Sequence, residues 1–248
     1  MTDPSAGFLK RIAAWLPGSL QHELRRLFFS RQIRRKRFFT DEQEYALLER
    51  YLSPGAWALD IGANVGHYAM RMSELVGASG RVIAFEPVPD TFALLSANAR
   101  LFAHRNVSLL NVAASERSAV VGMQIPVFSE GLSNYYQAHV TADVTELTVL
   151  SIAVDALALD APVRLVKIDV EGHELPVLRG MRALLERDHP VLIIETGSEE
   201  TLAFLHDLRY GTERLPGSSN VVCRHVGAPG TRHAPDRGTP AAVPSKSS

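Results

Sequence analysis

The sequence predicts an α/β protein built on a doubly wound, mostly parallel β-sheet. From residue 56 onward, short apolar segments alternate with segments that have the period of a helix. The predicted strands are apolar along nearly their whole length, which is typical of strands covered on both faces. The first two end in an acid, Asp60 and Glu86, as expected where parallel strands deliver polar groups to one edge of a sheet.

The predicted elements follow one another in a regular order. A short helix over 41–52 leads to a turn at Ser53-Pro54-Gly55. Strands are then expected at 56–61, 81–86, 107–112, 119–127, 148–153, 163–169 and 190–195. Helices are expected between them at 66–76, 90–103, 155–159, 174–186 and 199–208. The last strands, at 209–215 and 220–225, form a predicted hairpin around Pro216-Gly217-Ser218-Ser219 that adds antiparallel edge strands to the sheet.

Three regions differ in composition. Residues 1–52 are predicted to be a basic, helical N-terminal extension, and residues 53–226 the α/β domain. Residues 227–248 are rich in Gly, Pro, Ala and Ser and are predicted to be disordered. Within the domain, residues 128–146 have no clear period, and their aromatic and amide side chains favour a loop over a cleft.

The composition excludes several classes of protein. The formal net charge is -1, so no field of the whole molecule points to nucleic acid, and none is expected as a partner. The single cysteine, Cys223, excludes an internal disulfide framework and a Cys-rich metal site. No apolar run reaches the roughly 18 residues that span a bilayer. Lys10 and Arg11 interrupt the apolar stretch from Phe8 to Leu16, so no signal peptide is expected and the predicted location is cytoplasmic.

The turn after the first core strand indicates which ligand it holds. Gly62 and Gly66 permit unusual backbone angles and a close approach, as in a nucleotide-binding βαβ unit. A turn that binds phosphate presents N–H groups to a negative ligand and would avoid an acid, yet Asp60 stands here. The ligand is therefore expected to carry a positive group near Asp60 and a diol near Glu86. S-adenosylmethionine, with its ammonium, sulfonium and ribose and no phosphate, meets both requirements.

The candidate cofactor-binding residues lie at this turn and at the ends of the following strands. They are Asp60, Gly62, Ala63, Asn64, Gly66, Glu86, Pro87, Asn111, Ala113 and Asp169. An acid at a strand end often only caps the next helix, but four polar groups at consecutive strand ends are harder to explain in that way. Asn64 has two interpretations, a left-handed turn residue or a ligand of the methionyl carboxylate. Ala113 leaves room for a flat adenine ring.

The second chemistry-bearing segment runs from Lys167 to Glu174 and places several ionisable groups in one loop. Clustered carboxylates raise one another's pKa, which can prepare a base near neutral pH. The candidate catalytic residues are Asp169, Glu171 and His173, with Asp169 first by its place at the strand end. Two alternatives stay open: a metal site that adds Glu174 to these three, and helix capping with salt bridges. We assign no metal ligand.

The N-terminal extension carries a basic cluster from Arg31 to Arg37, flanked by Leu27-Phe28-Phe29 and Phe38-Phe39. One interpretation is a solvated helix face beside a docking stripe. The other is peripheral contact with an anionic partner or a membrane.

Seven segments together resemble the FkbM family of S-adenosylmethionine-dependent methyltransferases over about residues 57–197. They are Asp60-Ile61-Gly62-Ala63-Asn64-Val65-Gly66, Phe85-Glu86-Pro87, Asn98, Asn111-Val112-Ala113, Val154-Asp155-Ala156-Leu157, Lys167-Ile168-Asp169-Val170-Glu171-Gly172-His173-Glu174 and Val177-Leu178-Arg179-Gly180. The resemblance implies the class I methyltransferase fold, a seven-stranded Rossmann-like sheet with an antiparallel last strand. It also implies O-methylation of a sugar, glycolipid or other natural product. The family commonly has a small residue at position 173, so His173 is a departure that adds a base or fills space.

Other functions are considered beside this one. Methylation of a carboxylate or nitrogen of a small molecule or peptide needs the same cofactor site, and so does a non-catalytic binding module. A nicotinamide oxidoreductase would need the third glycine of its fingerprint, where this chain has His67. A nucleic-acid methyltransferase would need a base-flipping motif such as Asn-Pro-Pro-Tyr, which the sequence lacks. The oligomeric state is left open.

Overall fold

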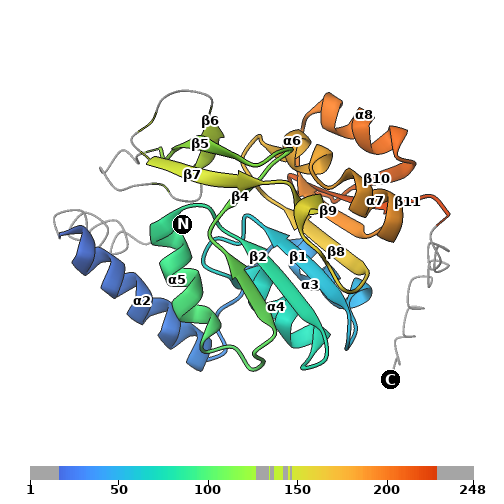
Figure 1. The fold of residues 1–248 in the computed structure, drawn as a ribbon. Helices are drawn as coiled ribbons and strands as arrows, with labels where there is room; N and C mark the ends of the chain where they lie inside the picture. Colours follow the sequence, from blue (N-terminus) through green and yellow to red (C-terminus); the bar gives the residue numbers. More distant parts are fainter. Residues whose placement is uncertain (1–16, 127–133, 135–136, 142–144, 146, 228–248) are drawn as a thin grey trace, which may run out of the picture.

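The structure is a computed structural model that describes residues 17–126, 134, 137–141, 145 and 147–227 (Figure 1). Its main sheet has seven strands in the order β10-β11-β9-β8-β1-β2-β3. Their bounds are β1 Trp57–Ile61, β2 Arg81–Phe85, β3 Val107–Leu110, β8 Val163–Ile168, β9 Val191–Glu195, β10 Tyr210–Arg214 and β11 Asn220–His225.

The strands of the main sheet are parallel except for β11. β1 pairs with β2 and β8 in parallel, whereas β11 runs antiparallel to both β9 and β10. The predicted hairpin and the predicted antiparallel last strand, β11, are confirmed. The expectation was wrong only for β10, which is not antiparallel to the rest of the sheet. β11 inserts between β9 and β10, so the edge strand β10 runs with the rest of the sheet. The insertion buries Val221, Val222 and Cys223, which an edge strand could not bury as fully.

Helices cover both faces of the sheet (Figure 1). The helices are α2 Gly18–Arg34, α3 Gln43–Tyr51, α4 His67–Val76, α5 Pro89–Ala99, α6 Glu174–Arg179, α7 Arg182–Asp188 and α8 Glu199–Asp207. One face packs on α3, α4 and α5, and the other on α6, α7 and α8. Successive residues of a strand point to opposite faces, so Ala58 packs with α4 while Leu59 packs with α6 and α7. α2 lies on the outside of α5.

A second sheet, which the sequence analysis did not separate from the first, stands beside the carboxyl ends of β1 and β2. It has four strands in the order β4-β7-β5-β6. Their bounds are β4 Ala113–Ala114, β5 Ala119–Gln124, β6 His139–Thr141 and β7 Leu147–Ile152. Its alternating strands cover a small apolar core around Met123 and Val149. The prediction of a loop over 128–146 is thus wrong for His139–Thr141, which form β6. Residues 127–133, 135–136, 142–144 and 146 lie outside the described residues.

Two predicted helices differ from the observed ones. The helix expected at 90–103 ends at Ala99. The helix expected at 174–186 is broken into α6 and α7 at Gly180, where a Cβ would lie 1.9 Å from the backbone oxygen of Ser115. The segment expected to be helical at 155–159 is a single 3₁₀ turn, Val154–Ala156.

The structure describes only part of the two predicted terminal regions. α2 and α3 lie within the predicted N-terminal extension, and residues 1–16 and 228–248 lie outside the described residues. Among the described helices, none is long and apolar enough to cross a membrane.

Candidate functional site

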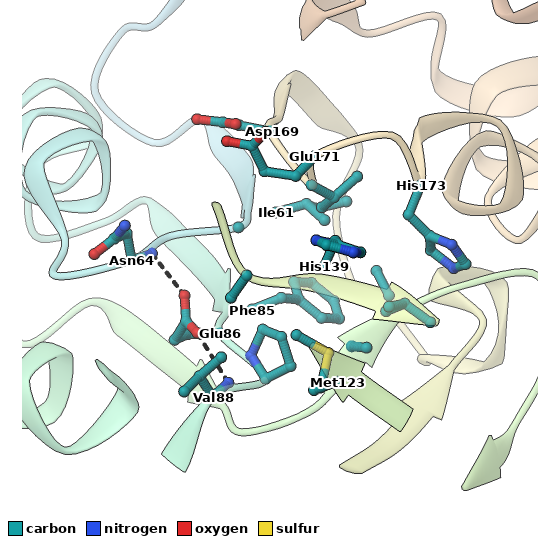
Figure 2. A pocket seen from close by; sticks show the side chains of 17 residues that line it. Ile61, Asn64, Phe85, Glu86, Val88, Met123, His139, Asp169, Glu171 and His173 are labelled. Carbon is teal, nitrogen blue, oxygen red and sulfur yellow. Dashed lines mark hydrogen bonds between the residues drawn. The ribbon is translucent and has the colours of Figure 1, made fainter. Parts of the chain in front are cut away.

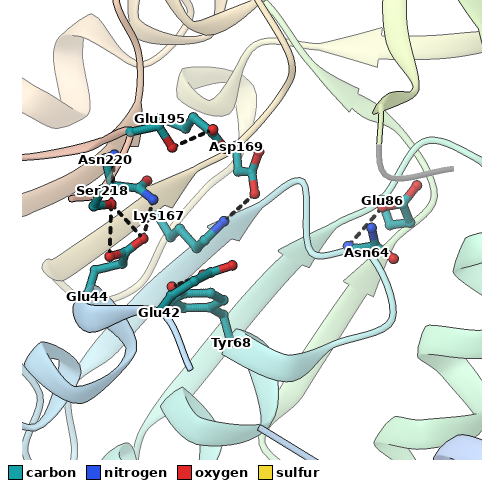
Figure 3. Close-up of polar contacts among 11 residues, drawn as sticks. Glu42, Glu44, Asn64, Tyr68, Glu86, Lys167, Asp169, Glu195, Ser218 and Asn220 are labelled. Atoms are coloured by element: carbon teal, nitrogen blue, oxygen red, sulfur yellow. Dashed lines mark hydrogen bonds and ion pairs between the residues drawn. The ribbon is translucent and has the colours of Figure 1, made fainter. Parts of the chain in front are cut away.

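The carboxyl ends of β1 and β8 bring two acids and a lysine together, and Figure 3 shows the ion pair between Lys167 and Asp169. Asp60 and Lys167 are register partners on neighbouring strands, and both side chains are buried. The Lys167 Nζ lies 2.8 Å from Asp169 Oδ2 and 4.5 Å from the centre of the Tyr68 ring. Lys167 is therefore a structural partner for the carboxylate of Asp169, since residues two apart along an extended chain share a face.

Asp60 has no hydrogen-bond partner for either carboxylate oxygen among the described residues, although it is fully buried. Burial raises the pKa of Asp60 to about 6, and nearby Lys167 opposes that rise. A buried carboxylate with unused lone pairs costs free energy unless a donor meets it. An ammonium group is such a donor, so the structure fits the cationic ligand expected at this position.

Glu86 lies at the end of β2 with its carboxylate held from two sides (Figure 2). Its Oε2 accepts the backbone N–H of Asn64, and its Oε1 accepts that of Val88, each at 2.9 Å. Each carboxylate oxygen keeps a free lone pair in this arrangement, so Glu86 can still accept a ribose diol. Burial raises the pKa of Glu86 to about 7.

The turn between β1 and α4 depends on positive φ angles. Gly62 has φ +83°, and a Cβ added there would lie 1.8 Å from the backbone oxygen of Asp169. Asn64 has φ 48°, which confirms the left-handed turn interpretation, and its buried Oδ1 has no partner among the described residues. Asn64 therefore also retains an acceptor that is open to a ligand.

Two recesses meet at this turn. The main pocket lies at the carboxyl ends of β1, β2 and β8. It is lined by residues that include Gly62, Asn64, Glu86, Pro87, Ala113, Met123, His139, Asp169, Glu171 and His173. The rear recess is lined by Phe39, Thr40, Asp41, Glu42, Asp60, Gly62, Ala63, Asn64, His67, Tyr68, Lys167 and Asp169. Gly62, Asn64 and Asp169 line both, so a ligand that crosses the turn could contact Asp60 at one end and Glu86 at the other.

Two predicted cofactor residues lie outside both recesses. The Asn111 amide donates to the backbone oxygens of Glu86 and Pro87, at 2.8 and 3.0 Å, and so supports the end of β2. Gly66 faces the core, where a Cβ would lie 2.7 Å from Leu95. The sequence could place both residues at the correct edge of the sheet, but not the direction in which each one faces.

The loop after β8 holds the three candidate catalytic residues at the same pocket (Figure 2). Burial and the neighbouring carboxylate of Asp169 raise the pKa of Glu171. The His173 Nε2 lies 2.9 Å from the Ser115 hydroxyl, and burial lowers the pKa of His173. Glu174 turns away and accepts the backbone N–H of Gly172. Among the described residues, no three His, Cys, Asp or Glu side chains form a group that could hold a metal.

The structure adds residues that the sequence analysis missed. Ser115 and Met123 come from the second sheet or its edge, and neither stands in a recognisable motif. Glu42, just before α3, accepts the Tyr68 hydroxyl at 2.5 Å and closes the rear recess (Figure 3). His139 was seen only as part of a loop, whereas β6 delivers it into the main pocket. An apolar-polar pattern cannot show which of these distant segments fold over the same strand ends.

A third recess, here called the side groove, shares the lining residue Glu171 with the main pocket. It is lined by Glu171, Gly172, Glu174, Leu175, Pro176, Arg179, Glu195, Thr196, Gly197, Ser198, Glu200, Thr201, Arg214 and Ser219. Glu195 and Thr196, at the end of β9, both line this groove. The groove carries four glutamates and two arginines beside its hydroxyl groups, so its side chains suit a polar, hydroxyl-rich molecule.

The affinity for S-adenosylmethionine is expected to rise as the pH is raised through 6 to 7. Asp60, with a pKa of about 6, and Glu86, with a pKa of about 7, carry protons below these values and then accept fewer hydrogen bonds. Each group changes the affinity by up to about ten-fold per pH unit below its pKa. Titration calorimetry at a series of pH values measures the effect. The Glu86→Gln variant should lose the part of the pH dependence that lies near pH 7. An affinity that is flat over this range would contradict the assignment.

Comparison with known protein sequences gives matches to the part of the chain that forms the recesses described above. The profile of a family described as "Methyltransferase FkbM domain" matches residues 60–211. The hexuronic acid methyltransferase AglP of Haloferax volcanii is 32% identical over 138 residues, which cover 54% of this chain and 53% of that protein. A protein-L-isoaspartate O-methyltransferase of Methanothrix thermoacetophila is 36% identical over 59 residues, 24% of this chain and 28% of that protein. The chain thus spans about half the length, or less, of these curated relatives.

Among solved structures, the methyltransferase FkbM of Methylobacillus flagellatus is similar with a TM-score of 0.52 and 18% identity. The match covers 70% of this chain and 44% of that one. At this identity the likeness concerns the fold alone, and it confirms the predicted α/β architecture with its large, mostly parallel sheet.

Proposed function

The chain belongs to the FkbM methyltransferase family, whose profile covers more than half of it, and on this premise we propose that it methylates a hydroxyl group of a saccharide. Family membership confirms the predicted enzyme class and the predicted cofactor, S-adenosylmethionine. The observation that carries the finer proposal is the side groove, which shares Glu171 with the main pocket and offers hydroxyl, carboxylate and guanidinium groups.

The acceptor class is supported by two independent features. The relative that is named a hexuronic acid methyltransferase matches over about half of this chain. In the side groove, Arg179 and Arg214 can pair with a uronate carboxylate, while Glu195 and Ser219 can bond ring hydroxyls. Ser219 already donates to Glu195 at 2.6 Å, so this pair is held in place before any acceptor binds. A carboxylate-bearing sugar is therefore the acceptor that we propose.

We further propose separate tasks for the residues of the two pockets. Asp60 would hold the cationic end of the cofactor, and Glu86 its ribose. When bound, S-adenosylmethionine supplies a methyl group on a sulfonium, an excellent leaving group. Aligning an acceptor hydroxyl with that methyl group is the main task of the protein, and well-oriented reactants can lower a barrier by about 7–11 kcal/mol.

A sugar hydroxyl is not acidic, so a base that takes its proton should help the reaction. Asp169 is the first candidate by position, but its Oδ2 lies 2.8 Å from Lys167 Nζ, so that oxygen is already engaged in an ion pair. Glu171 lines both the main pocket and the side groove, and its pKa is raised by burial and by Asp169. We therefore propose Glu171 as the proton acceptor, with Asp169 and His173 positioning the loop.

With a uronate-containing oligosaccharide and radiolabelled S-adenosylmethionine, we expect the protein to form a product that retains its label in alkali. A methyl ether resists alkali, whereas a methyl ester releases methanol, so the treatment separates O-methylation of a hydroxyl from methylation of the carboxylate. Arg214→Gln should raise KM for the uronate acceptor about ten-fold, because it removes a charge-assisted hydrogen bond. KM for the matching neutral oligosaccharide is the control and should stay unchanged.

An alkali-labile product would replace hydroxyl methylation by carboxylate methylation. Cofactor binding without transfer to the charged or the neutral saccharide would contradict the proposed acceptor class.

A further inference from the structure

The outward face of α2 is apolar over its first half. Leu20, Leu24, Leu27 and Phe28 are 44%, 46%, 56% and 57% exposed, and their spacing places them on one side of the helix. Phe39, just beyond the helix, is 53% exposed. These five residues, here called the α2 stripe, make up most of the large hydrophobic side chains exposed in the described part of the chain.

The opposite face of α2 is fixed to the domain, so the stripe is held facing outward. Phe29 is 7% exposed and packs edge-to-face against Phe38, which in turn stacks on His67 at 4.0 Å. His22 Nε2 lies 3.2 Å from the backbone oxygen of Asp90 at the start of α5. α2 therefore lies along α5 (Figure 1), and its apolar side cannot turn inward without breaking these contacts.

The second half of the same helix is strongly basic. Arg31 and Arg34 continue the outward face, and the chain then runs through Arg35, Lys36 and Arg37. The only acid between Gly18 and Arg37 is Glu23, which pairs with Arg26 at 2.8 Å. The exposed surface of α2 thus joins an apolar stripe to a dense cation cluster.

We propose that α2 docks on an anionic lipid surface. Leucine and phenylalanine side chains enter the boundary between headgroups and acyl chains, while guanidinium groups bind lipid phosphates, so both halves of the face are used. A second copy of this chain would supply the same positive charge and no complementary acids on α2. A free phosphate ligand would leave the leucines unexplained.

The position of the stripe gives the docking a consequence for the catalytic domain. Phe39 belongs to the stripe and also lines the rear recess, together with Glu42, Asp60 and Asp169. A docked α2 would therefore set the segment that closes this recess at the lipid surface. The inference does not rest on the proposed acceptor, because lipid binding is measured without turnover.

The test is co-sedimentation of the full chain with vesicles of phosphatidylcholine, with and without phosphatidylglycerol, at low and high salt. We expect binding only to the vesicles with phosphatidylglycerol, weakened by salt. A Leu20→Ser/Leu24→Ser/Leu27→Ser variant and an Arg31→Gln/Arg34→Gln/Arg35→Gln variant should each bind at least about ten-fold more weakly. Control variants are Val120→Ser/Leu150→Ser, for exposed apolar residues elsewhere, and Arg105→Gln/Arg164→Gln/Arg182→Gln, for exposed arginines elsewhere.

Each result has a definite meaning. Loss of binding in the two α2 variants, with unchanged controls and unchanged circular dichroism, supports the docking surface. Three results overturn it: no binding to the anionic vesicles, equal loss in the controls, or a dimer in sedimentation velocity that the leucine variant dissociates. Binding of single-stranded RNA in place of the vesicles would also overturn it.

Discussion

Replacing Gly62 by alanine is expected to lower the free energy of unfolding by about 3 kcal/mol or more and to abolish cofactor binding. Two effects add at this position: the backbone angle φ +83°, which costs an alanine about 1–2 kcal/mol, and overpacking, which costs about 1–3 kcal/mol. The overpacking is severe because the neighbour 1.8 Å away is the backbone oxygen of Asp169, which no rotamer change can remove. Moving it would separate the ends of β1 and β8, where both recesses meet.

The matched control is Gly55→Ala. Gly55 has nearly the same angle, φ +88°, but the nearest atom to an added Cβ is Ser79 Oγ at 3.7 Å. The Gly55→Ala variant should therefore lose only about 1–2 kcal/mol of its free energy of unfolding, the cost of the backbone angle, and should bind cofactor normally. Urea denaturation and calorimetry with S-adenosylhomocysteine measure both quantities. Equal destabilisation of the two variants would show that the contact with Asp169 is unimportant.

Replacing Glu171 by glutamine is expected to lower kcat by about 10²- to 10⁴-fold, the usual contribution of a general base. Glutamine keeps the size of the side chain and removes its ability to take a proton. In the unaltered enzyme, kcat should rise with pH through the raised pKa of Glu171, and in the variant this limb of the profile should disappear. Cofactor affinity should change little, since Glu86 and Asp60 are untouched.

Two companion variants separate this role from positioning. Asp169→Asn removes the partner of the buried Lys167, so it should lower stability as well as activity. His173→Ala removes the contact with Ser115 and should lower kcat less, with the pH profile retained. If Asp169→Asn alone abolished the pH-dependent limb while cofactor binding stayed normal, Asp169 would be the base. If all three variants kept full turnover, base catalysis in this loop would be wrong.

Most of the central sheet could be predicted from the chain alone. The strands β1, β2, β8 and β9 are short apolar runs buried on both faces. A strand covered on both faces must be apolar along nearly its whole length, so the residue pattern alone is enough to predict it. The wrong boundaries have local causes that a pattern does not contain. The break between α6 and α7, for example, lies at Gly180, which packs against Ser115, sixty-five positions away in the sequence.

By itself, the sequence determined the ligand chemistry of the strand ends. An acid near the end of β1, a glycine two residues later and an acid after β2 lie within about thirty residues, so chain connectivity alone brings them to one edge. Only the tertiary structure decided which side chains face the pocket. Asn111 and Gly66 turn away from it, whereas His139 reaches the main pocket and Glu42 the rear recess from segments that carry no motif. The reason is physical: local patterns record the burial of each segment, but the direction of a side chain across a cleft depends on how separate segments pack together.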